Sequence, residues 1–192
     1  MDLPRRLRAA TSELHRRVED AIDLPASVRT REDYVEVLGR FWQLHSPLEQ
    51  RLASATWAPR WTELGVELSR HRRAHLLADD LAVLDEPLVT RPVWLPALRT
   101  FGEALGCLYV LEGSSLGGRV LAPALRNAVG NVPLTFFSGQ DRGHPEPWQA
   151  VREALRRFDA RQGHQVVLGA RETFAAFGKH VGGLAPAGGS TA

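Results

Sequence analysis

Leu-Tyr-Val-Leu-Glu-Gly-Ser-Ser-Leu-Gly-Gly-Arg-Val, residues 108–120, is the stretch that decides the fold we expect for this chain. It begins as a strong helical run and then places glycines at positions 113, 117 and 118. A glycine inside a helix costs about 1 kcal/mol relative to alanine, so the three together cost about 2–3 kcal/mol. We therefore expect a compensating feature, which is a tight helix crossing, a kink, or a flat ligand lying against bare backbone.

Apolar residues on both sides of this stretch recur at spacings of three and four, the period of an amphipathic helix. Thr30 and Asp33 stand where the two residues of a capping box would start a second helix. No segment alternates in the manner of a β-strand. The sequence predicts an all-α, single-domain helical bundle. The expected helices cover 3–20, 31–55, 62–84, 97–129 and 148–181, the last broken near Gly163 and Gly169.

The length and composition limit the function classes. The chain has 192 residues, enough for one domain, which we place at 1–181, before a tail, 182–192, that we expect to be disordered. A formal net charge of +2 gives no argument for nucleic-acid binding. The single cysteine excludes an internal disulfide and a zinc cluster built on cysteines. The N-terminus lacks the apolar region of a signal peptide, and no apolar run is long enough to span a membrane. We expect a cytoplasmic protein.

A polar stripe runs along the first helix beside its apolar face. Arg8, Thr11, His15 and Glu19 are three or four residues apart and share one side of the helix. Glu19 can accept a hydrogen bond from Nδ1 of His15, which leaves Nε2 free for a metal. Arg8 lies about 10 Å away along the axis, at about 1.5 Å per residue. A flat ligand with a metal at its centre and carboxylates at its edge, such as haem, matches that spacing.

Two motifs resemble a known family. Leu-Arg-Ala-Ala-Thr-Ser-Glu-Leu-His-Arg-Arg-Val-Glu (7–19) and Tyr-Val-Leu-Glu-Gly-Ser-Ser-Leu-Gly-Gly (109–118) are similar to those of haem oxygenases, in particular the bacterial branch that accompanies bacteriophytochromes. The resemblance covers residues 3 to about 180 and is weak over 130–165. It implies an all-α fold that holds haem between a proximal N-terminal helix and a kinked, glycine-rich distal helix.

The resemblance also implies roles for single residues. His15 matches the proximal ligand of the haem iron, and Glu19 the acid that orients it. Gly113, Gly117 and Gly118 match the glycines of the distal helix, and we assign them, with the serine between them, to the catalytic site.

Other positions line the expected pocket. Arg8 and Tyr109 fall where bacterial members place a basic residue and a tyrosine against the haem propionates. Ser114 replaces the aspartate with which animal enzymes anchor a distal water network, so the details of proton delivery stay open. Phe174 and Phe177, in the last helix, are candidates for a pocket wall or for ordinary core.

The implied reaction is the oxidative opening of haem to biliverdin, with release of carbon monoxide and ferrous iron. Haem is both cofactor and substrate, dioxygen is the co-substrate, and electrons come from an external reductase of the ferredoxin or flavoprotein type. A bacteriophytochrome is a candidate recipient of the biliverdin. The resemblance does not extend to the glycine-rich segment 138–147, so we assign it no role.

Two alternatives remain at this point. One is a haem-binding or haem-delivery protein without turnover, which would share His15. The other is a thiaminase-like hydrolase on the same scaffold with Cys107 as nucleophile, although a buried helix cysteine is the simpler interpretation. His71 and His75, four residues apart in an arginine-rich stretch, form a further candidate metal pair, which we disfavour because the stretch looks solvated.

Overall fold

The computed structural model describes residues 2–139 and 147–182, and these residues form helices and connecting loops. Four long helices build the bundle: α1 (Leu3–Ile22), α2 (Arg31–Leu52), α5 (Phe101–Val129) and α8 (Gly163–His180). Shorter helices are α3 (Ala58–Glu63), α4 (Ala74–Val83), α6 (Thr135–Ser138) and α7 (Pro147–Arg157), with 3₁₀ turns η1 (Leu68–His71) and η2 (Ala160–Gln162). The all-α prediction is confirmed.

The helix starts follow the local sequence. Asp33 N–H donates to Thr30 Oγ1 over 3.1 Å, and Thr30 N–H donates to Asp33 Oδ2 over 3.0 Å, so the predicted capping box is formed at α2. The backbone N–H groups of Arg29 and Thr30 both donate to the Asp33 carboxyl and hold its pKa below its usual value, the bond from Arg29 being the largest cause. The Thr100 hydroxyl accepts from Glu103 N–H at the start of α5.

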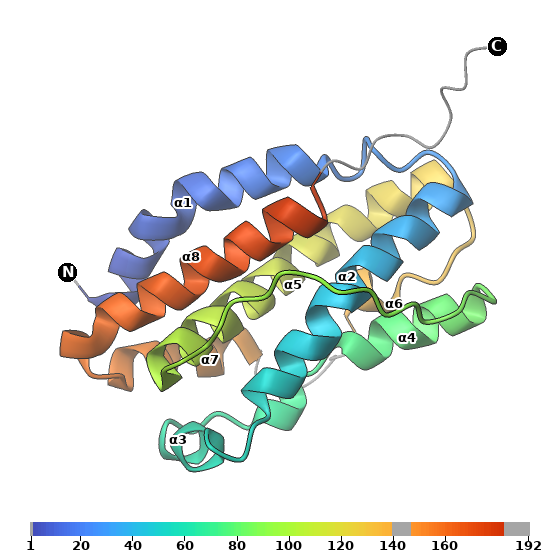
Figure 1. Cartoon of the computed structure of the whole chain (residues 1–192). Helices are drawn as coiled ribbons and strands as arrows, with labels where there is room; N and C mark the ends of the chain where they lie inside the picture. The colour runs from blue at the N-terminus through green and yellow to red at the C-terminus, as the bar shows by residue number, and fades with distance from the viewer. Residues whose placement is uncertain (1, 140–146, 183–192) are drawn as a thin grey trace.

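α8 lies between α1 and α5 and makes the most extensive contacts of the bundle with both (Figure 1). The α5–α8 crossing is close because two glycines face the opposing backbone. A Cβ on Gly106 would lie 2.1 Å from the Val166 carbonyl oxygen, and one on Gly169 would lie 2.1 Å from that of Glu103. Only glycine fits at either position. The sequence stretch that we singled out is therefore not where the tightest crossing lies.

Two of the predicted helices were wrong in detail. The expected helix over 62–84 is divided into α3, η1 and α4, and Gly65, with φ of +73°, ends the first of these turns. α3 also occupies part of the expected connection 56–61. The expected break near Gly163 is confirmed, but Gly169 lies inside an unbroken α8, because its role is the backbone contact with α5.

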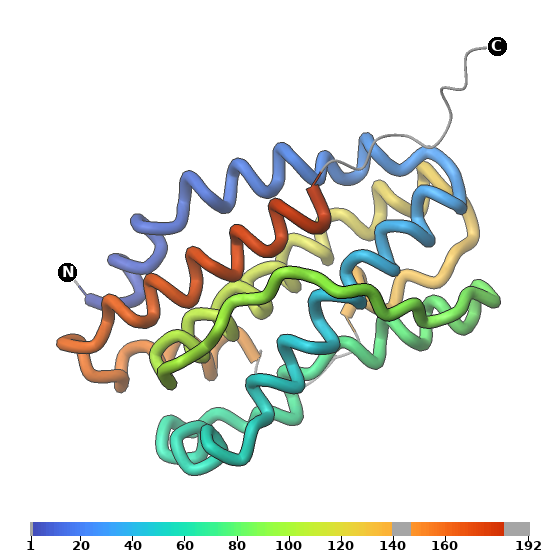
Figure 2. The backbone as a smooth tube through the Cα atoms, in the orientation of Figure 1, coloured from blue at the N-terminus to red at the C-terminus, as the bar shows by residue number. Residues whose placement is uncertain are grey.

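The loop between α4 and α5 crosses the bundle over α2, as the backbone tube in Figure 2 shows. It is tied to α2 by arginines: Arg51 donates to the Pro96 carbonyl, and Arg31 bonds the Leu84 carbonyl and Glu86. No helix within the described ranges is long and apolar enough to cross a bilayer. The predicted tail, 182–192, lies outside the described ranges from residue 183 onward, and the domain bounds stay a prediction.

Candidate functional site

A cavity of about 780 Å³ lies between α1, α5 and α8, a volume typical of sites for small molecules and cofactors. Every site residue proposed from the sequence contributes to its lining. The first helix supplies Arg8, Thr11, His15 and Glu19, α5 supplies Tyr109, Gly113, Ser114, Gly117 and Gly118, and α8 supplies Phe174 and Phe177. The geometry therefore brings together two motifs that are about 100 residues apart in the sequence.

The α1 wall presents a histidine that is already oriented. His15 Nδ1 lies 3.3 Å from Glu19 Oε2, one turn along the helix. The edge of the ring packs at right angles against Phe174, with 5.6 Å between the ring centroids. Both side chains of the pair are about half exposed or more, at 49% for His15 and 63% for Glu19, so solvent reaches this wall. With Nδ1 facing the carboxylate, Nε2 is the nitrogen left for a metal.

The α5 wall exposes bare backbone at its glycines. A Cβ on Gly117 would meet nothing within 4 Å, and one on Gly113 would meet only the Trp148 ring, at 3.9 Å. Gly118 is different, because its Cβ would lie 3.2 Å from the Phe137 carbonyl oxygen of α6. α5 continues as helix through all three positions. Two of the glycines therefore leave room in the cavity, and the third permits helix packing.

Ser114 Oγ donates to the Leu111 carbonyl of its own helix over 2.7 Å. The hydroxyl proton is thus committed to the backbone, and the oxygen lone pairs remain to accept a hydrogen bond from water. A serine in this arrangement can bind a water molecule as an acceptor but supplies no acid.

One end of the cavity is polar. Tyr109 lies beside Thr11 and Arg8, and its ring packs on that of Trp148 with 5.2 Å between the centroids. Burial raises the pKa of the Tyr109 phenol, while the hydrogen bond with Thr11 and the charge of Arg8 act in the opposite direction. The Thr11 hydroxyl donates to the Leu7 carbonyl over 2.9 Å, so the phenol and the guanidinium are the groups that suit the carboxylates of a ligand.

The other end is aromatic, and sequence reasoning missed most of it. Phe41 of α2 and Phe136 and Phe137 of α6 line the cavity with Phe177. Their rings contact one another at centroid distances of 5.2–5.9 Å. Two adjacent phenylalanines in the glycine-rich segment after α5 were the available signal, although the resemblance is weak there. Trp148 and Arg73, which also line the cavity, gave no signal at all.

The structure does not support Cys107 as a nucleophile or His71 and His75 as a metal pair. Cys107 is buried in α5, and burial raises the pKa of its thiol to about 12, so it is a poor nucleophile at neutral pH. His75 is exposed, whereas His71 is buried and its Nδ1 lies 2.9 Å from Glu112 Oε1. The expectation that this stretch is solvated was therefore wrong for His71. The two histidines share no site, and the described residues contain no cluster of metal-binding side chains.

The residues present fit haem. His15 offers an oriented imidazole, the open backbone at Gly113 and Gly117 leaves space on the opposite wall, and the two ends of the cavity differ in polarity as the edge of haem does. The segment 140–146, to which we had assigned no role, lies outside the described residues.

Comparisons with known proteins agree with this geometry. The chain is 33% identical to a haem oxygenase from Xanthomonas campestris over 153 residues, covering 76% of this chain and 87% of that protein. Its structure resembles the NO- and CO-bound haem oxygenase of Neisseria meningitidis with a TM-score of 0.75 and 22% identity, over 94% of this chain and 90% of that one. No family model matches the sequence. The extent of the first match is sufficient to establish that the chain belongs to the haem oxygenase family.

Proposed function

We propose that this protein opens haem oxidatively to biliverdin, releasing carbon monoxide and ferrous iron. The observation that carries the proposal is one cavity with an oriented histidine on the α1 wall and bare glycine backbone on the α5 wall. Bound haem supplies the iron at which dioxygen is reduced and the porphyrin carbon that is oxidised. The residues of this chain bind haem, orient its iron ligand and enclose it.

His15 is the proposed proximal ligand, and Glu19 fixes its tautomer and ring orientation. Gly113 and Gly117 let the opposite face of haem lie close to the α5 backbone and leave room for a small diatomic ligand. Ser114 holds water by accepting a hydrogen bond. Arg8 and Tyr109 are the proposed partners of the propionates, and the aromatic end encloses the apolar edge.

The electrons come, in this proposal, from a separate reductase of the ferredoxin or flavoprotein type. The bacteriophytochrome as recipient of the product and the cytoplasm as location stay predictions of the sequence.

Spectroscopy tests the proposal. Haem added to the purified protein should give the absorption spectrum of a histidine-ligated complex. With reductant and oxygen, the Soret band should decay and a biliverdin spectrum should appear. Haem that stays intact under these conditions would leave only the haem-delivery alternative. Chromatography of the bilin then identifies which meso carbon has been attacked.

A further inference from the structure

The aromatic end of the haem cavity is carried by a helix that is too short to be stable alone. α6 has four residues, and two of them, Phe136 and Phe137, line the cavity. A single helical turn is unstable in water, because fixing its backbone costs more than its few hydrogen bonds return. Leu134, the residue at its N-cap, has an apolar side chain that cannot cap it. The position of the two rings therefore depends on the residues of other helices that hold α6.

A buried carboxylate of α4 caps α6 from outside. Asp80 is 1% exposed, its Oδ1 accepts from Thr135 N–H over 3.1 Å, and its Oδ2 accepts from Phe136 N–H over 3.0 Å. These two N–H groups stand at the start of the helix, where they have no carbonyl partner within it. The described lining of the haem cavity does not include Asp80, and the proposed function has not used it. Its two hydrogen bonds tie α6 to α4.

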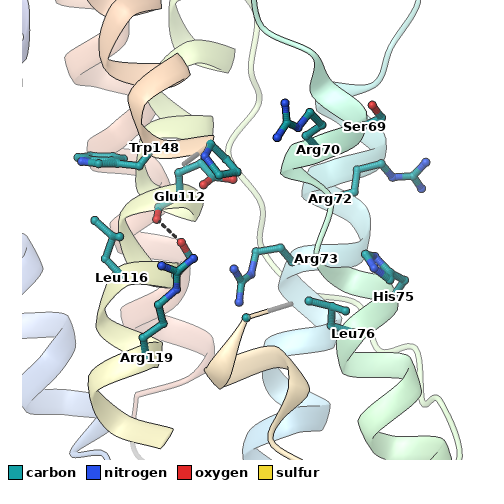
Figure 3. Close-up of a pocket in the computed structure, with 13 residues that line it drawn as sticks. Ser69, Arg70, Arg72, Arg73, His75, Leu76, Glu112, Leu116, Arg119 and Trp148 are labelled. Atoms are coloured by element: carbon teal, nitrogen blue, oxygen red, sulfur yellow. Dashed lines mark hydrogen bonds between the residues drawn. The ribbon is translucent and has the colours of Figure 1, made fainter. Parts of the chain in front are cut away.

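Tyr34 and Arg73 hold the same segment from two further sides. The Tyr34 hydroxyl, from α2, donates to the Pro133 carbonyl over 2.7 Å. Arg73 donates to the Phe136 carbonyl, and its Cζ lies 5.1 Å from the centroid of that ring. Figure 3 shows Arg73 extending from the wall of η1 and α4 into a smaller cavity of about 170 Å³, which α5 closes on the other side. Together with the close approach of Gly118, these contacts locate α6 relative to α2, α4 and α5.

The aromatic end matters for haem because an iron ligand alone does not fix how the ring is turned. Rotation about the bond between the iron and His15 would leave the ligand in place. Arg8 and Tyr109 are the proposed contacts at the propionate edge, and the rings of α6 face the opposite edge. Methyl and vinyl groups project unequally from that edge, so a close-packed wall favours one angle of rotation over the others. A wall that can shift accepts more than one angle.

We propose that Asp80 and Tyr34 are positioning residues of the haem site. By holding α6, they place Phe136 and Phe137 against the apolar edge of haem and thereby determine its orientation within the slot. This inference rests on the proposed function, and neither residue touches haem or its iron ligand. Because the orientation of haem decides which meso carbon lies next to the open backbone of α5, the two residues also affect which bilin isomer forms.

The test uses two variants that loosen α6 in different ways. Asp80→Asn keeps one acceptor oxygen, so one N–H of α6 loses its partner and faces the NH₂ of the amide. Tyr34→Phe removes only the hydroxyl and keeps the ring. Glu103→Gln is the matched control, because it makes the same replacement of carboxylate by amide at another buried helix start. Glu103 is 5% exposed, accepts from Arg99 N–H over 2.8 Å and does not line the haem cavity.

The orientation of haem can be measured without turnover. Each protein is loaded with haem, converted to the ferric cyanide complex and examined by proton NMR. The shifts of the haem methyl resonances depend on the angle between the haem axes and the plane of the ligating imidazole, so each orientation gives its own set. Haem affinity and thermal unfolding are recorded for the same samples. The proportions of bilin isomers after turnover are a separate measurement.

We expect Asp80→Asn to bind haem and to show an additional set of methyl resonances, at about a tenth of the total intensity or more. Tyr34→Phe should show a smaller change in the same direction, since Asp80 still caps α6 in that variant. The spectrum of Glu103→Gln should match that of the unmodified protein. The proportions of bilin isomers should shift only in the two variants that loosen α6.

An unchanged methyl pattern in folded Asp80→Asn would overturn the inference. The same new resonances in Glu103→Gln would also overturn it, because they would indicate a general loosening of the bundle. If Asp80→Asn does not fold, Tyr34→Phe decides, and an unchanged pattern there overturns the inference. Failure of the unmodified protein to bind haem would overturn this inference together with the proposed function. Haem binding without turnover would overturn the proposed function alone, because the NMR comparison needs no turnover.

Discussion

Nδ1 of His15 lies 3.3 Å from Oε2 of Glu19, with one helical turn between the two residues. The pairing costs the chain little, because both residues already face the cavity from α1. The imidazole is therefore held by a carboxylate of its own helix on one side and by the Phe174 ring of α8 at its edge.

Variants of the two residues should distinguish the residue that binds the haem iron from the residue that orients it. His15→Ala should lose the histidine-ligated ferric spectrum, and added imidazole should restore it. Glu19→Gln should keep the ligand and weaken haem affinity or turnover by about 10- to 100-fold, the range typical of residues that orient a metal ligand. Absorption titration with haem measures both. An unchanged spectrum in His15→Ala would mean that another residue binds the iron.

Gly117→Ala should make the protein more stable and less active. The new Cβ meets no atom within 4 Å, so the helix gains up to about 1 kcal/mol in the free energy of unfolding. The same methyl group enters the haem cavity and should lower haem affinity or turnover. Gly39→Ala in α2 is the matched control, since its Cβ also meets nothing within 4 Å but Gly39 does not line the cavity. Denaturant unfolding should therefore show a stability gain for both variants, whereas haem titration should show a loss of affinity only for Gly117→Ala.

Gly106→Ala should have the opposite effect on stability. Its Cβ would lie 2.1 Å from one backbone atom of α8 and 2.7 Å from another, and backbone cannot move aside as a side chain can. We expect a loss of about 3 kcal/mol or more in the free energy of unfolding, at the upper end of overpacking costs. Thermal and urea unfolding measure the loss. A stability equal to that of the unmodified protein would contradict the close α5–α8 crossing.

Cys107 makes stability depend on alkaline pH. The unfolded thiol ionises near its ordinary pKa of 9.0, whereas burial keeps the folded thiol protonated up to about 12. The folded state therefore holds a proton that the unfolded state releases, so the contribution of this thiol to stability should be constant below about pH 9 and decline above it. Between pH 9 and 10, before the tyrosines contribute, Cys107→Ala should reduce this decline. The same variant should keep full haem turnover; a loss of turnover would reopen the hydrolase alternative.

The fold was largely predictable because its signals are local. The stripe around His15, the capping box at Thr30 and the run into Gly113 are each contained within a few turns of helix. The division of residues 62–84 was not predictable, because apolar spacing continues across Gly65 and only the tertiary structure shows its positive φ. The sequence also suggested a helix break near Gly169, although this glycine is needed for close contact with the backbone of Glu103.

The candidate site was predictable to the extent that its residues belong to the two motifs. Trp148 and Phe41 reach the cavity from helices whose own sequences give no sign of it. His71 was misjudged because its neighbours in sequence are arginines, while its partner Glu112 lies 41 residues away. The burial of a polar side chain by a distant element cannot be inferred from the spacing of residues around it in the sequence.

The position of α8 has a consequence for which porphyrins this scaffold accepts. α8 contacts both the helix that carries His15 and the helix that carries the glycine run, so it acts as the spacer between the two faces of the slot. Its separation from α5 is set by Gly106 and Gly169, neither of which lines the haem cavity. Substrate selectivity in this architecture can therefore drift through residues that the substrate never meets.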